Sequence, residues 1–185
     1  WVPWAHAELA LGSSGLQAAR LWAHERVVQA MAEQCATCVE RLRLRLGDAA
    51  ADLGSDPVRL PTHRLSGEHG RLGPFDWWVL PRAEGRVVTL LRHRGSGVMV
   101  AHGLLWGDGP PDLRDADLPL LQMALDRLSA WPGSPGRWVG ESGSLLDARG
   151  VQAQAQYLAR LRAEAAEGVR RGDLGTEAPR WSAPP

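Results

Sequence analysis

Between residues 16 and 46, apolar side chains return every three or four positions, which is the period of an amphipathic helix. The stretch contains no Pro and no Gly, so we expect one long helix, and its length leaves a break within it open. Ser13 or Ser14 is the expected N-cap and Gly47 the expected C-cap. The period is carried by Leu16, Ala19, Ala23, Val27, Met31, Cys35, Cys38, Val39 and Leu42.

After an expected loop at 48–57, the pattern changes to short apolar runs separated by turn residues, which is typical of strands. The last two runs are joined through Gly95–Gly97, a spacing that predicts a hairpin. The runs lie at Val58–Pro61, Trp77–Leu80, Val87–Leu91 and Val98–Ala101.

The second half of the chain predicts two more helices with a short strand between them. One helix is expected over Asp117–Ala130 and the other over Asp147–Arg171, with the strand at Arg137–Val139. This order predicts a layered α/β or α+β domain over residues 1–171. A polar, Pro-rich tail is expected at 172–185.

The composition and charge of the chain argue against two classes of protein. The chain has no Lys, no Ile and no Asn, and its basic and acidic residues balance at 21 each. This balance argues against a nucleic-acid binder, which usually carries a basic face. No apolar run is long enough for a membrane span.

The most conspicuous short motif is Cys35-Ala-Thr-Cys38, within the predicted helix. Residues three apart share a helix face, so the two thiols are expected to be neighbours. Packing or a structural disulfide, a redox role and a metal site all stay open. Against a redox pair stands its distance from a helix N-terminus, and against zinc stands the lack of a second such pair.

Among the six histidines, His6 and His102 each close an apolar run before a turn, a kind of position that often lines sites. Gly140-Glu141-Ser142-Gly143 adds an acid and a hydroxyl in a tight turn. A Ser nucleophile there lacks the spacing of a nucleophile elbow.

Several segments in order resemble the metallo-β-lactamase fold, and within it the periplasmic quinoprotein relay system zinc metallohydrolases. The resemblance implies an α/β fold with αββα layers. Here the fold would be incomplete at the N-terminus, because the chain begins almost at the first zinc motif. The segments are Trp4-Ala-His6-Ala-Glu8-Leu9, Ala10-Leu-Gly12, the helix with Cys35 and Cys38, Val98–Trp106, Pro111–Leu118 and Val139–Gly143.

The zinc ligands of that family carry over only in part. In the first motif, Trp4 and Leu9 stand where the family has His, while His6 is kept and Glu8 replaces Asp. Three later ligand positions fall on Glu84, on Gly103 with His102 before it, and on Glu141. The resemblance therefore implies an eroded zinc site in which His6, Glu8 and Glu84 are an incomplete ligand set.

Two hypotheses follow from this erosion. The first is a non-catalytic binding or structural module with no cofactor. The second is a hydrolase with a reduced site, mononuclear in zinc or metal-free, acting on an ester, thioester, lactam or phosphoester through His102 and Glu141. A redox role for Cys35 and Cys38 is a third hypothesis.

The resemblance also implies a periplasmic location and an exposed sheet edge. Missing N-terminal strands would leave backbone groups of the sheet unpaired, which favours pairing with another chain. We therefore expect a protein partner or a second copy to cover this layer, unless the chain is a fragment. No nucleic acid is expected as a partner.

Overall fold

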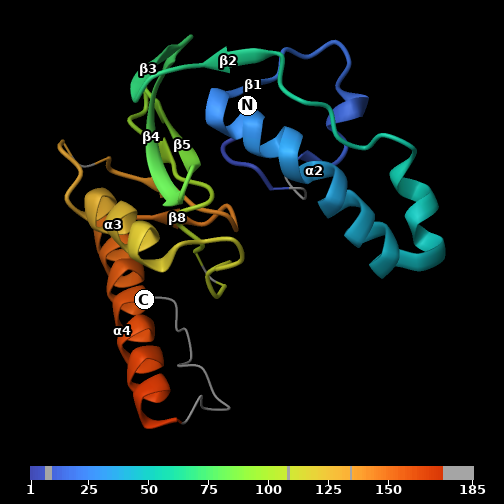
Figure 1. The fold of residues 1–185 in the computed structure, drawn as a ribbon. Coiled ribbons are helices and arrows are strands. Elements are labelled where there is room, and N and C mark those ends of the chain that lie inside the picture. The colour runs from blue at the N-terminus through green and yellow to red at the C-terminus, as the bar shows by residue number, and fades with distance from the viewer. Residues whose placement is uncertain (7–9, 108, 134, 173–185) are drawn as a thin grey trace.

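The computed structural model describes residues 1–6, 10–107, 109–133 and 135–172, and they form two sheets between helices (Figure 1). The larger sheet has six strands in the order β3-β4-β5-β6-β7-β8, and only β6 and β7 are parallel. The smaller sheet pairs β1 (Trp22–His24) with β2 (His63–Leu65) in parallel. The six strands are β3 (His69–Leu72), β4 (Phe75–Ala83), β5 (Arg86–His93), β6 (Met99–Val100), β7 (Trp138–Val139) and β8 (Leu145–Leu146).

Helices cover both faces of the larger sheet (Figure 1). Side chains alternate along β5, so Val88 and Leu90 join the core beneath α3 (Leu118–Ser129) and α4 (Ala148–Arg171). Val87 points the other way, into the core beneath α2 (Glu25–Leu46). The expected layered α/β fold is therefore confirmed.

The first helix begins later than its period predicts. Residues 22–24 pair with β2 instead, and α2 starts at Glu25. Its N-cap is His24, whose Nδ1 accepts a hydrogen bond from the Arg26 amide at 3.2 Å. The predicted caps were wrong, because the Ser13 hydroxyl instead accepts a hydrogen bond from the backbone amide of Arg59 at 2.7 Å. Tertiary strand pairing thus overrides the helical period.

Two smaller details of this half also differ from expectation. The strand predicted at Val58–Pro61 is wrong, since Val58 makes only an isolated bridge to Leu11. The loop predicted at 48–57 begins as a 3-10 helix, η2 (Gly47–Leu53), after a first one, η1 (Ser13–Gly15). The Gly47 C-cap is confirmed, because its amide donates to the carbonyl of Arg43.

The sequence did not predict β2, β3 or β8, but the other predicted elements are present. The β5–β6 hairpin around Gly95–Gly97 is confirmed, with Leu91 paired to Val100. The two later helices begin after caps at Asp117 and Asp147. The tail predicted at 172–185 lies outside the described residues beyond Gly172. None of the helices in the described ranges is long and apolar enough to cross a membrane.

Candidate functional site

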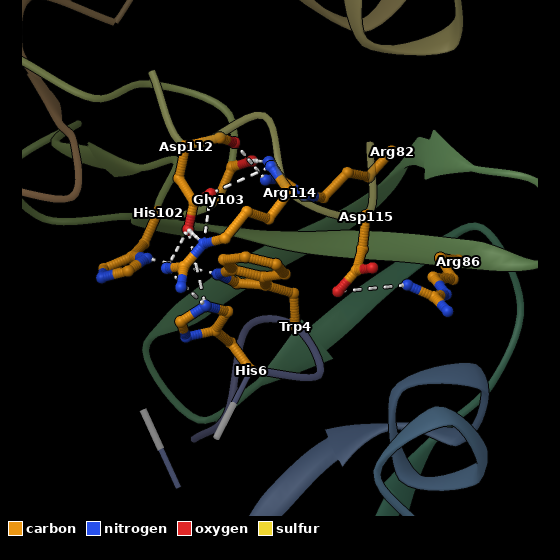
Figure 2. Close-up of polar contacts among 9 residues, drawn as sticks. All are labelled: Trp4, His6, Arg82, Arg86, His102, Gly103, Asp112, Arg114 and Asp115. Carbon is orange, nitrogen blue, oxygen red and sulfur yellow. Dashed lines mark hydrogen bonds and ion pairs between the residues drawn. The ribbon is translucent and has the colours of Figure 1, made fainter. Parts of the chain in front are cut away.

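The candidate site lies where the N-terminal segment meets the loops that follow β4, β6 and β7 (Figure 2). This segment is held between the two sheets by its backbone. The Val2 amide donates to the Trp22 carbonyl at 2.8 Å, and the Thr89 amide donates to the Pro3 carbonyl at 2.8 Å. The side chains of Trp4 and His6 are thereby carried over the end of the larger sheet.

The Trp4 indole packs directly against Gly103. A Cβ added at Gly103 would lie 2.7 Å from Cδ1 and 2.8 Å from Nε1 of the indole, closer than any side chain tolerates. Gly103 also has a φ of 96°, which disfavours other residues. The two positions that the resemblance assigns to metal ligands are therefore in contact, and the indole, 6% exposed, fills the space between them.

Arg82 completes the centre of the cluster from β4. Its guanidinium lies 4.1 Å from the centroid of the Trp4 ring, a cation–π distance. It donates to the carbonyl oxygen of Gly103, and Nη2 donates to that of Asp112 at 2.5 Å. Burial lowers the pKa of Arg82, while the negative charges of Glu141, Asp112 and Asp115 act in the opposite direction.

A β-bulge explains how a strand residue reaches this place. The β4–β5 register shifts between Pro81 and Ala83, so Arg82 has no partner on β5. Bulges bend a strand and redirect its side chains, often beside functional sites. The Arg82 side chain is only 3% exposed as a result.

An exposed arginine closes the cluster on the side of His6. Arg114 donates to both carboxylate oxygens of Asp112, at 2.7 Å from Nη2 and 3.0 Å from Nε. The hydrogen bond from the Arg114 side chain is the main reason why the pKa of Asp112 falls to about 2. His6 Nε2 lies 3.5 Å from the same carboxylate, and its ring centroid is 4.6 Å from that of Trp4.

His102 and Glu141 have pKa values that move in opposite directions. Trp4 Nε1 donates to His102 Nδ1 at 3.4 Å, and burial is the largest cause that lowers the pKa of His102. Burial also raises the pKa of Glu141, against the opposing charge of Arg82 and a hydrogen bond from the Gly103 amide. Burial thus shifts both groups toward their uncharged forms.

The structure describes two of the three residues predicted as metal ligands, and only one of them lies in the cluster. His6 joins the cluster, Glu84 is exposed in the β4–β5 turn, and Glu8 lies outside the described residues. Within the part of the chain that the structure describes, no three His, Cys, Asp or Glu side chains are placed to hold a metal. The metal assignment of His6, Glu8 and Glu84 stays a prediction.

Sequence reasoning missed Arg82, Asp112 and Arg114. No sequence signal marks Arg82, because the bulge that places it depends on how β4 pairs with β5. No sequence signal marks Asp112, because only the folded loop brings it beside His6.

The two cysteines are free thiols on α2, so the structural disulfide is not formed here. Cys35 packs in the core beneath the helix, and burial, with a smaller effect of Cys38, raises its pKa to about 11. This favours the packing role over a reactive pair for Cys35.

Neither a family model nor a curated protein matches the chain, whereas solved structures do. A metallo-β-lactamase from Pontibacter korlensis matches with a TM-score of 0.62 and 14% identity, over 85% of this chain and 67% of that one. FIM-1 from Pseudomonas aeruginosa, in a mono-zinc form, has a TM-score of 0.60 and 17% identity, over 86% and 65%. TTHA1623, in a di-iron-bound form, has a TM-score of 0.57 and 21% identity, over 83% and 73%.

These similarities show that the chain has the metallo-β-lactamase fold. It spans about two thirds of the length of the first two of these neighbours. The identities show the fold alone, so the narrower likeness to the quinoprotein relay system hydrolases stays a prediction.

Proposed function

We propose that this chain is a non-catalytic binding or structural module of the metallo-β-lactamase fold. In this proposal, an indole and a guanidinium replace metal ions as the groups that hold the cluster together. The observation that carries it is the contact of Trp4 with Gly103 under the buried guanidinium of Arg82. In this proposal, Trp4 fills the space and Arg82 provides the positive charge that metal ions would otherwise provide.

The donor set of the cluster supports the same proposal, because it does not fit a pair of metal ions. His102 Nδ1 already accepts a hydrogen bond from Trp4, and His6 Nε2 faces the Asp112–Arg114 pair. A metal cation entering here would also be repelled by the fixed charge of Arg82, which stays protonated at any ordinary pH. We extend the proposal to a periplasmic location, for which the resemblance is the support.

Metal content tests the proposal directly. Protein expressed with zinc supplied, then desalted, should contain far less than one zinc per chain by elemental analysis, and His6→Ala should leave that content unchanged. Added zinc should also leave the melting temperature unchanged, since a ligand that binds the folded state raises it. Stoichiometric zinc that is lost in His6→Ala would overturn the proposal.

A hydrolase with a reduced site is the second candidate, and the opposite pKa shifts of His102 and Glu141 favour it. Paired groups with separated pKa values are typical of acid–base sites. This candidate requires ester, thioester, lactam or phosphoester turnover that falls in both Glu141→Ala and Glu141→Gln. Absence of turnover over such a panel, with and without supplied metals, would leave the non-catalytic module.

A further inference from the structure

A cavity lies beside the cluster, between α2 and the loop that precedes α3. Its volume is about 150 Å³, enough for a small ligand. Cys38, Arg41 and Arg45 line it from α2, and these positions follow each other at three and four residues, so they share one helix face. Arg114 and Asp115 line it from the opposite loop.

The walls of this cavity carry an excess of positive charge. Arg41 and Arg45 are exposed and have no ion pair or side-chain hydrogen bond to any part of the chain that the structure describes. The acid within reach is committed elsewhere, because the Asp115 carboxylate lies 3.7 Å from Arg86 Nη1. Figure 2 shows this pair on the other side of Trp4 from His102.

The backbone of the loop is strained at Asp115. Asp115 has a φ of 56°, the one positive φ of a residue other than Gly in the described ranges. Asp tolerates this conformation better than most residues, yet it still costs free energy that tertiary contacts must offset. The contact with Arg86 offers such an offset.

We propose that this cavity binds a small phosphate-type oxyanion, held by Arg41 and Arg45 of α2, while Arg114, paired with Asp112, adds positive charge from the opposite wall. A guanidinium presents its N–H groups as a planar fork that matches phosphate and carboxylate oxygens. The two forks of α2 would contact different oxygens of one anion. The inference goes beyond the proposed function, because it assigns an anion to a cavity that shares only His6 and Arg114 with the central cluster.

The thiol of Cys38 offers a reporter, because it lies in the wall of the cavity. We would measure the rate at which iodoacetamide alkylates Cys38 at constant pH and ionic strength, with increasing inorganic phosphate. Phosphate should slow the reaction several-fold and saturably. O-phosphoserine in a parallel titration distinguishes a phosphomonoester ligand from free phosphate. The metal content of the same sample is recorded, so failure of this inference and of the proposed function are separate results.

Charge-matched variants decide whether the cavity is responsible. The double variant Arg41→Gln with Arg45→Gln should lose the protection. Arg20→Gln with Arg64→Gln changes the net charge equally at two exposed positions outside the cavity and should keep it. Equal slowing by chloride at the same ionic strength, or full protection in the Arg41/Arg45 variant, would overturn the inference.

Discussion

At the scale of the residue, the candidate site depends on a few side chains that fill its space and balance its charge. Trp4 supplies the volume, Gly103 the room for it, and Arg82 the positive charge. Each of these roles is lost by a single substitution, so each can be tested separately.

Arg82→Met should destabilise the fold by about 3 kcal/mol. Met fills the space of the side chain but leaves the carbonyl groups of Gly103 and Asp112 without their donor. Arg82→Lys keeps the positive charge but not the planar guanidinium, and it should lose less stability than Arg82→Met. Urea unfolding of the original protein and the two variants ranks their stabilities. A Met variant as stable as the original would contradict the structural role of Arg82.

Iodoacetamide should alkylate Cys38 in the folded protein and leave Cys35 unmodified. Burial raises the pKa of Cys35 to about 11, so at about pH 8 roughly one molecule in a thousand carries its thiolate. Peptide mass spectrometry reads both sites, and Cys38→Ser is the control. Equal modification of both thiols in the folded state would support the redox hypothesis instead.

At the scale of the element, the caps of the helices connect local sequence to the site. Asp117 caps α3 through its carboxylate, and its own amide donates to the carbonyl of Arg82 at 3.0 Å. The start of α3 is therefore fixed to the bulged end of β4, from which the guanidinium extends.

Asp117→Ala should cost about 1 kcal/mol of stability, the usual loss for an N-cap. The carboxylate accepts from the Leu120 amide at 3.0 Å, and Ala leaves that amide without a partner. Asp126→Ala, in the last turn of the same helix, is the control and should change stability little, because it removes only an exposed hydrogen bond from Gln122. Chemical denaturation of both variants gives the comparison, and equal losses would show that the cap is unimportant.

The cap of α4 should make stability depend on acid pH. The hydrogen bond from the Gly150 amide is the main cause that lowers the pKa of Asp147 below its ordinary 3.8. The unfolded chain then binds the proton more tightly, so this contribution is present above 3.8 and is lost as the pH falls through the lower, folded value.

Asp147→Asn separates titration from capping, because Asn is also a good N-cap. The stability difference between the original protein and the Asp147→Asn variant should be larger at about pH 6 than at about pH 3. Urea unfolding at both pH values measures it. A difference that does not change with pH would exclude the carboxylate charge as its source.

At the scale of the whole molecule, the sheet carries a core on each face and gathers distant segments at one end. The N-terminal segment, the end of β4, the loops after β6 and before α3, and the turn after β7 meet there (Figure 1). The core under α3 and α4 is the larger one, and Leu90 lies within it with 0% exposure.

Leu90→Ala should therefore destabilise the fold by about 2–5 kcal/mol, since it leaves a cavity in this core. Leu44→Ala is the matched control, because Leu44 is 84% exposed on α2 and its loss should stay within about 0.5 kcal/mol. Thermal or urea unfolding compares the two. Similar small losses would mean that the face under α3 and α4 is not a packed core.

The sequence by itself determined the elements whose signals are local. The Gly47 cap, the β5–β6 hairpin and the two later helices depend on neighbours within a few residues. Backbone groups at helix ends and turns need hydrogen-bond partners close by in the chain, so the residue types that suit caps and turns can be recognised in the sequence. His6, His102 and Glu141 were also singled out from the sequence, through position and resemblance, and their roles stay predictions.

Only the tertiary structure decided the start of α2 and the centre of the site. Residues 22–24 have a helical period, yet pairing with β2 makes them a strand. The hydrogen bonds of Arg82 to Gly103 and Asp112, and the contact of His6 with the Asp112–Arg114 pair, join segments separated by tens of residues. These contacts form because burial and long-range hydrogen bonds lower the free energy of the folded chain, and no local sequence pattern encodes them. They place an arginine at the centre of this cluster.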